Sequence, residues 1–168
     1  MKPPLLFLCH RIPYPPNKGD KIRAWHLLRH LATEFDVHLA TFVDDPADWQ
    51  HTRVLEDLCA STHFAPLVAW RATLASVTGL ATGEALSLPY YRSAGAGLAA
   101  WVARCAEREG VRHAMAYSSA MAQFLPGEGG KQRGNKCGEP GAEIPRKIID
   151  FVDVDSDKWL QYAVHKPW

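Results

Sequence analysis

Five short strand-like runs, separated by helix-forming segments, constrain the fold of this chain more than any other feature. The runs are residues 5–9, 36–42, 62–66, 112–117 and 147–152. Apolar spacing and capping residues predict helices over 19–33, 44–59 and 94–109, with shorter helical segments within 70–77, 120–125 and 156–162. Strands that alternate with helices favour a parallel sheet covered by helices on both faces. We therefore predict an α/β fold, a Rossmann-like three-layer sandwich with a mostly parallel sheet.

The length and composition of the chain limit the kinds of protein that it can be. With 168 residues, 47% of them hydrophobic and 22% charged, it has room for one globular domain spanning residues 1–168. A formal net charge of +1 gives no support to a nucleic-acid binder, which would be expected to show a basic face. The four cysteines are scattered, which is typical of reduced thiols, and no apolar run is long enough for a signal peptide or a membrane span. We expect a cytoplasmic protein.

A glycine-rich stretch, "GEGGKQRGNKCGEPGAEIP", interrupts the pattern before the last strand. Its low apolar content predicts a flexible surface insertion over residues 127–145.

The loop after the first strand is the first candidate binding site. Ligands of parallel α/β sheets bind beyond the carboxyl ends of the strands, and this loop leads into a helix N-terminus, where backbone N–H groups attract phosphate. The candidate residues are Asn17, Lys18, Gly19, Asp20 and Arg23. The alternative is that Asn17, Gly19 and Asp20 only turn and cap the chain, with the Asp20 carboxylate occupying the N–H groups that an anion would use.

The last strand ends in a run of four carboxylates within "IIDFVDVDSDKW": Asp150, Asp153, Asp155 and Asp157. An Asp-x-Asp at the end of a strand can hold a divalent metal or place a nucleophile, although this one lies late in the chain for a phosphatase motif. The loop is no EF-hand, because Lys158 stands where the glycine is required. The plainer alternative is a solvated helix cap at Asp155 or Ser156.

Three smaller features complete the candidates. Tyr90 and Arg92 offer an aromatic surface and a cation to a sugar or phosphate, while packing is the alternative for the tyrosines. Ser118 and Ser119 follow a strand and can donate to a substrate or cap the next helix. His26 and His30 have metal-ligand spacing, but such a pair is usually surface or packing, and we predict no metal site.

Several blocks of the sequence resemble one glycosyltransferase family. The blocks are "CHRIPYPPNKGDKIRAWHLLRHLA", "FVDDPADW", "TGEALSLPYYR", "SSAMAQF" and "DFVDVDSDKWLQYA". In this order they resemble the N-terminal region of the GT-B class sugar transferases associated with exosortase (PEP-CTERM) systems. The resemblance covers most of the chain outside the glycine-rich stretch.

The resemblance implies the N-terminal, acceptor-side half of a GT-B fold, with a C-terminal donor-binding domain beyond Trp168. It implies transfer of a sugar from a nucleotide sugar, as co-substrate and without a further cofactor, to a glycan or lipid-linked acceptor in surface polysaccharide synthesis. Such acceptors imply contact with the inner face of the cytoplasmic membrane. Asp153 or Asp155 would orient the acceptor or take its proton. Relatives often carry a second glycine where this chain has Asp20, which weakens the phosphate assignment.

Two other functions remain open at this stage. A non-catalytic Rossmann-like module would capture a nucleotide or phosphorylated sugar, and a metal-dependent enzyme would use Asp153 and Asp155. Without its partner domain the chain would by itself be inactive. It would also expose apolar surface, with Trp159 and Trp168 as candidates, that favours homodimers.

Overall fold

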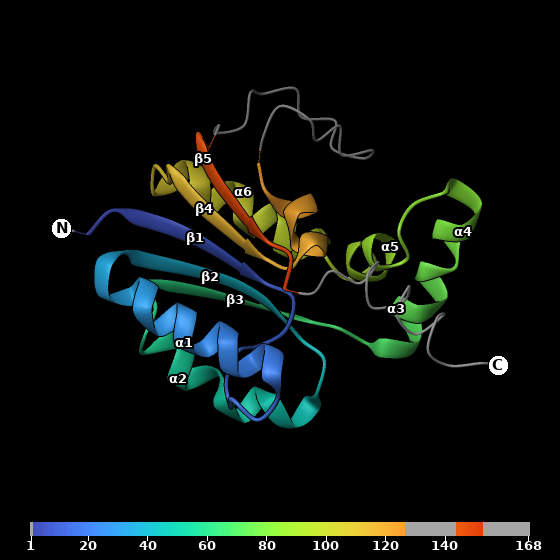
Figure 1. Cartoon of the computed structure of the whole chain (residues 1–168), viewed down its shortest axis with the longest axis horizontal. Helices are drawn as coiled ribbons and strands as arrows, with labels where there is room; N and C mark the ends of the chain where they lie inside the picture. Colours follow the sequence, from blue (N-terminus) through green and yellow to red (C-terminus); the bar gives the residue numbers. More distant parts are fainter. Residues whose placement is uncertain (1, 127–143, 153–168) are drawn as a thin grey trace, which may run out of the picture.

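A computed structural model, which describes residues 2–126 and 144–152, has the predicted α/β architecture (Figure 1). Its strands are β1 Pro4–Cys9, β2 Asp36–Val43, β3 Ser61–Pro66, β4 His113–Tyr117 and β5 Arg146–Asp150. The α-helices are α1 Gly19–Glu34, α2 Thr52–Glu56, α3 Ala69–Ser76, α4 Thr78–Thr82, α5 Ser87–Arg92 and α6 Ala96–Arg108, and two 3-10 helices are η1 Pro46–His51 and η2 Ser119–Phe124. The five strands form one sheet in the order β3-β2-β1-β4-β5, and every neighbouring pair is parallel.

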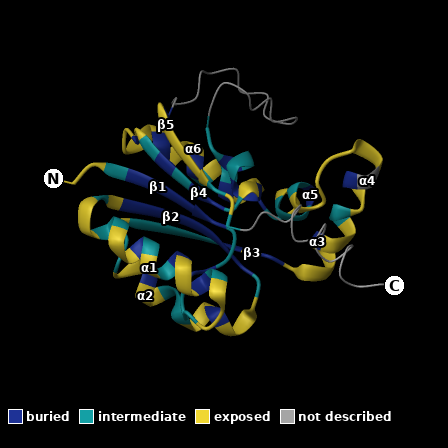
Figure 2. Ribbon diagram, viewed as in Figure 1, coloured by how far each residue is buried: buried dark blue, intermediate teal, exposed yellow. Residues whose placement is uncertain are grey.

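Alternate residues of the central strands fill two separate apolar cores. Leu6 and Leu8 of β1 face the core that α6 covers, while Phe7 faces the core beneath α1 and α2. Buried residues accordingly concentrate in β1, β2 and β4, whereas β5 at the sheet edge is largely exposed among the described residues (Figure 2). Continuous apolar runs are therefore the expected sequence signature of the central strands.

The strand order places a topological switch point between β1 and β4. The chain leaves β1 toward β2 and β3, and then returns to the other side of β1 to form β4 and β5. In open parallel sheets a crevice forms at such a point, outside the carboxyl ends of the strands. We therefore expect a functional site among the residues that follow β1 and β4.

Helix α1 buries most of the stripe that its sequence predicts, but not the first residue of that stripe. Leu28 is buried, and Trp25 and Leu31 pack against the same core. Ile22, by contrast, is 43% exposed, while the neighbouring Lys21 is 2% exposed. Lys21 donates to Asp48 at 2.8 Å, and this ion pair joins α1 to η1. A buried partner for the ammonium group removes the main cost of turning Lys21 inward.

Two further expectations need correction. The helix predicted over 44–59 is two shorter pieces, η1 and α2, although Asp45 does cap its start by accepting from the Ala47 N–H at 2.9 Å. The segment "PYYR", which no predicted helix included, belongs to α5, because Pro89 lies in its first turn, where a missing N–H costs nothing.

Substitution by alanine should have opposite effects on the free energy of unfolding at two nearby glycines, Gly95 and Gly97. A methyl group at Gly95 would overlap the ring of Phe124, which is 5% exposed, whereas at Gly97 the nearest atom is 4.0 Å away. Gly95→Ala should lower the free energy of unfolding by about 1–3 kcal/mol through overpacking. Gly97→Ala should raise it by about 0.5–1 kcal/mol through helix propensity. Urea denaturation of both variants checks this, and equal effects would contradict the packing around Phe124.

Several sequence predictions lie outside the described residues. They concern Asp153 and Asp155, the helix over 156–162, Trp159 and Trp168, and the insertion over 127–145 except its last two residues. Among the residues that the structure does describe, no helix is long and apolar enough to cross a bilayer.

Candidate functional site

Arg11 organises the carboxyl edge of the sheet at the switch point. Its Nε donates to Asp44 Oδ2 at 2.9 Å, and its Nη1 donates to Asp20 Oδ2 at 3.0 Å. Partial burial alone would lower the pKa of Arg11, but the two carboxylates outweigh burial and raise it. Because Asp44 follows β2 and Asp20 opens α1, one guanidinium group fixes three segments around the crevice.

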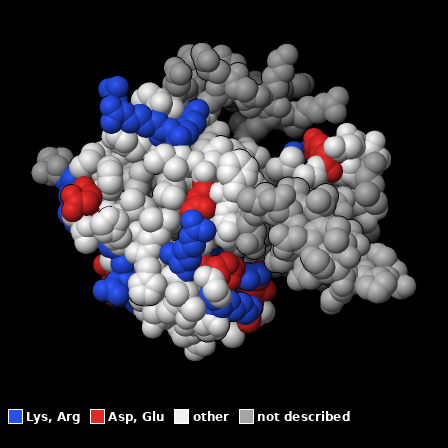
Figure 3. Space-filling model, viewed as in Figure 1, with Lys and Arg blue, Asp and Glu red and all other residues white. Residues whose placement is uncertain are grey.

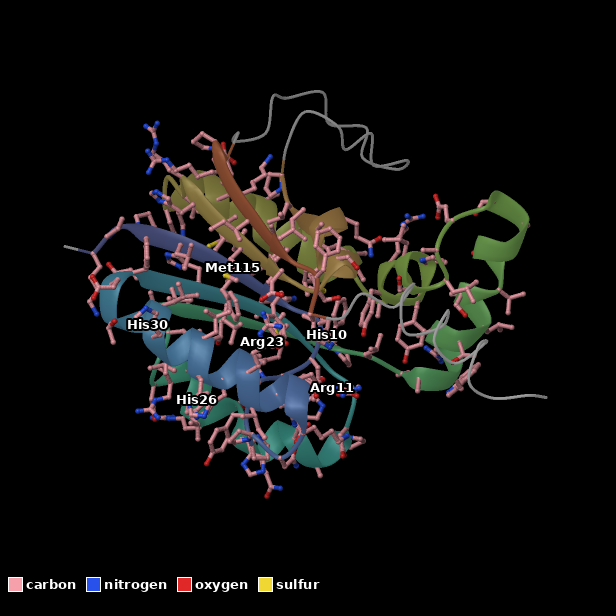
Figure 4. The ribbon with its side chains drawn as sticks, viewed as in Figure 1. His10, Arg11, Arg23, His26, His30 and Met115 are labelled. Carbon is pink, nitrogen blue, oxygen red and sulfur yellow. The ribbon has the colours of Figure 1, made fainter. Side chains whose placement is uncertain are left out.

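His10 lies beside Arg11 (Figure 4), and its ring contacts two tyrosine rings. Its ring stacks on Tyr117 with centroids 5.9 Å apart and meets Tyr91 edge-on at 6.3 Å. Nδ1 lies 3.3 Å from the Tyr117 carbonyl oxygen, which can only accept, so the proton of the neutral ring is assigned to Nδ1. Burial lowers the pKa of His10, against the opposing effects of that carbonyl and Asp20. At neutral pH, Nε2 is therefore a free acceptor.

The site is rich in hydrogen-bond acceptors that lack donors. His10 Nε2 faces Asp20 Oδ2 at 3.5 Å, and Asp44 Oδ1 is buried without a hydrogen-bond partner among the described residues. Buried polar atoms are normally satisfied, and an orphaned acceptor calls for a donor from outside the protein. Hydroxyl, amine or water protons fit this arrangement.

Tyr117 and Arg23 connect the site to α1 and to the end of β5. The Tyr117 hydroxyl donates to the Asp20 main-chain oxygen at 3.1 Å, and the Arg23 guanidinium lies 5.8 Å from the centre of the Tyr117 ring. Arg23 also donates to Asp150 at 2.7 Å, so the end of β5 is tied to α1. Figure 3 shows basic and acidic side chains next to each other in the middle of this face, where α1 and the end of β5 meet.

Tyr91 and Tyr117, the two tyrosines of the site, should ionise at a higher pH than ordinary tyrosines. Burial raises the pKa of Tyr117 and of Tyr91 from 10.0 to about 12. Because the folded state holds these protons more tightly, its stability should be intact below pH 10 and decline between pH 10 and about 12. Absorbance titration at alkaline pH should show Tyr117→Phe losing one late-ionising group, and a titration in which every tyrosine ionises near its ordinary pKa would contradict this.

Comparison with family models, with curated proteins and with solved structures finds no match to this chain.

The N-terminus of α1 is free of the cap that its sequence suggests. Asp20 makes no capping hydrogen bond, because its carboxylate is turned to Arg11, and the residue before the helix, Lys18, provides none either. A Cβ at Gly19 would meet nothing within 4 Å, and Asn17 and Lys18 are exposed. Asp20 therefore does not cap the helix, and phosphate binding at this turn stays a prediction.

The "PYYR" residues divide between the site and the surface around it. Tyr91, rather than the predicted Tyr90, reaches the site, since it contacts both His10 and Phe42. Arg92 is 54% exposed and bonds to Glu84 and Gln123. We call Arg11 with its two carboxylate partners, Asp20 and Asp44, the Arg11 cluster. Neither Tyr90 nor Arg92 contacts this cluster in the described hydrogen bonds and ring pairs.

The two serines after β4 sit at the switch point but do not cap. Ser118 has a φ of 99°, which is rare for a residue with a side chain, and its N–H donates to the Asp150 carbonyl at 2.8 Å. Its side chain makes no capping hydrogen bond to η2, and Ser119 is exposed. Backbone strain of this kind is often found at ligand sites.

His26 and His30 lie exposed along α1, away from His10 (Figure 4). No cluster of three or more metal-ligating side chains occurs within residues 2–126 and 144–152. The surface interpretation of this pair is confirmed.

Sequence reasoning overlooked the centre of the site. His10, Arg11 and Asp44 were not candidates, although each lies within two residues of the end of a predicted strand. That position, next to the switch point, was the signal that could have identified them.

Proposed function

We propose that this chain forms the acceptor side of a nucleotide-sugar-dependent glycosyltransferase. The observation that carries the proposal is a surplus of acceptors around His10, whose ring contacts those of Tyr91 and Tyr117. These acceptors are His10 Nε2, which faces Asp20, and the unpaired Asp44 Oδ1. Sugars present hydroxyl donors at their edges and apolar C–H faces that pack on aromatic rings. The sequence resemblance supports the same activity.

The transfer step assigns His10 as general base. The acceptor hydroxyl oxygen bonds to the anomeric carbon of the donor, while the bond from that carbon to the phosphate oxygen breaks and the nucleoside diphosphate leaves. Nε2 of neutral His10 takes the hydroxyl proton, and the nearby Asp20 carboxylate stabilises the resulting imidazolium. Arg11 holds Asp20 and Asp44 in place. Asp153 and Asp155 follow three and five residues after Asp150, and their role in orienting the acceptor remains part of the proposal.

The donor side of the proposal rests on the first turn of α1. Uncapped N–H groups, an open Gly19 and the exposed Lys18 suit a diphosphate. In the Arg11 cluster, by contrast, two carboxylates surround one cation and would repel phosphate. We therefore place the donor diphosphate at Gly19 and the acceptor sugar at His10, with a second domain encoded downstream closing over the donor.

A transfer assay tests this function. The polypeptide encoded by the whole reading frame, extended beyond codon 168, is incubated with labelled nucleotide sugars and candidate acceptors, with and without EDTA. We expect transfer that survives EDTA. Binding of a nucleotide sugar without transfer would favour the non-catalytic module, and transfer that requires Mn²⁺ or Mg²⁺ would favour the metal-dependent enzyme. The absence of a second α/β domain downstream would count against the proposal.

A further inference from the structure

Strand β5 forms an open edge of the sheet. The strand order ends at β5, and no strand pairs with its outer side among the described residues. The first four residues of β5 are exposed, and Ile148 and Ile149 are 62% and 41% exposed. The opposite edge strand, β3, is more covered, since Trp49 packs on Phe64 there. An exposed edge that carries apolar side chains is a template on which another strand can pair.

The outward backbone groups of this edge belong to Lys147 and Ile149. On the inner side, the Arg146 N–H donates to the Arg112 carbonyl at 3.2 Å, and the Asp150 carbonyl accepts from the first N–H after β4 at 2.8 Å. Successive residues of a strand turn their N–H and C=O groups to opposite sides, so Lys147 and Ile149 turn theirs away from β4. Two residues of the edge thus offer both a donor and an acceptor to a second strand.

The side chains of β5 are self-complementary in antiparallel pairing. The strand reads "RKIID", with cations at its start and a carboxylate at its end. When two copies run antiparallel with Ile148 opposite Ile148, Arg146 of each copy lies opposite Asp150 of the other, and Lys147 lies opposite Ile149. The residues with outward backbone groups then face each other, and each such pair can exchange two hydrogen bonds. Opposite charges at directly opposed positions stabilise a pair of strands.

Other symmetric registers lack this match. A register centred on Lys147 sets two ammonium groups opposite each other, which is destabilising. A register centred on Ile149 leaves Asp150 opposite Ile148, where no charge meets it. Registers centred between two residues are excluded by the backbone, because they would oppose an outward-facing residue to an inward-facing one.

Both charged groups of the predicted contact can make it without giving up another. Arg146 forms no ion pair with any described residue, and its Nη1 lies 3.4 Å from His113 Nε2. Asp150 accepts from Arg23 at 2.7 Å and from the Val152 N–H at 2.9 Å. Because a carboxylate has about four acceptor positions, Asp150 retains room for a second guanidinium group.

We propose that two copies of this chain form a twofold dimer by antiparallel pairing of β5, in the register centred on Ile148. The sheet then runs continuously through both copies, and the same residues contribute from each side. This interface uses neither Trp159 nor Trp168 and is independent of the proposed glycosyl transfer. Since one short strand from each copy forms it, we expect a dissociation constant on the order of 1–100 μM.

Sedimentation of the full chain, at concentrations from well below to well above the micromolar range, tests the proposal. The chain should change from monomer to dimer as its concentration rises. Arg146→Asp places like charges opposite each other at both ends of the interface and should raise the dissociation constant about tenfold or more. Asp150→Lys should do the same. A mixture of the two variants should recover the dimer, because each substituted residue then meets the opposite charge in the other copy.

Two further variants provide the control and test the backbone pairing. Arg112→Asp makes the same change of charge on an exposed residue beside β5, and it should leave association unchanged. Ile149→Pro removes an N–H that β4 does not use, so it should abolish the dimer and preserve the fold. Circular dichroism confirms that each variant is folded. A chain that stays monomeric, a dimer that survives Ile149→Pro, or a mixture of the charge variants that fails to associate would overturn the proposal.

Discussion

Replacing Lys21 by methionine should lower the free energy of unfolding by about 3–5 kcal/mol, the usual cost of leaving one member of a buried ion pair alone. Lys21 Nζ lies 2.8 Å from Asp48 Oδ2, and the two side chains are 2% and 9% exposed. Without the ammonium group, the Asp48 carboxylate would have to remain charged inside the fold or take up a proton. Urea denaturation at neutral pH measures the loss.

A double variant separates the missing partner from lost packing. Lys21→Met/Asp48→Leu removes both charges and should recover most of the stability, because apolar replacements of buried pairs are often neutral or stabilising. The exposed pair Arg53–Asp57, with side chains 81% and 69% exposed, provides the control. Arg53→Met should change stability by less than about 0.5 kcal/mol. A Lys21→Met effect as small as that of the control would mean that water reaches Asp48.

This ion pair also bears on the site. Lys21 directly follows Asp20 in the sequence, and Asp48 lies four residues after Asp44. The buried pair thus clamps the two segments whose carboxylates hold Arg11. We infer that Lys21 is a positioning residue for the Arg11 cluster as well as a stabilising one.

The fold could be predicted from local patterns because its central strands are buried on both faces. Runs such as "LLFLC" indicate such strands, and their alternation with helices leaves few topologies open. Lys21 shows the limit of the method. A helical pattern assigns a lysine to solvent, and only the three-dimensional position of Asp48 makes its burial favourable.

The site was harder to predict because its chemistry is assembled from separate segments. The loop after β1 was found, since prolines, Gly19 and a following helix mark it in the sequence. The pairing of Arg11 with Asp44, 33 residues later, has no local signature. The direction of the Asp20 side chain was left open, because a cap is a local interaction that the sequence suggests, while the stronger partner, Arg11, is identified only by the three-dimensional structure.

Substituting His10 by phenylalanine should lower the turnover of the proposed sugar transfer by about 10²–10⁴-fold, the usual contribution of a positioned general base. Phenylalanine keeps the stack on Tyr117 but loses the hydrogen bond to the Tyr117 carbonyl, so the free energy of unfolding should fall by only about 0.5–1.5 kcal/mol. In the unchanged enzyme, activity should fall as the pH drops through the pKa of His10, which burial lowers below 6.5, because protonated Nε2 cannot take a proton. This loss of activity at acidic pH should be absent from the pH profile of His10→Phe.

His26→Phe, on the exposed side of α1, is the matched control, and it should keep both the turnover rate and the pH profile of the unchanged enzyme. A His10→Phe enzyme with full turnover would mean that another group, with Asp153 and Asp155 the next candidates, takes the proton.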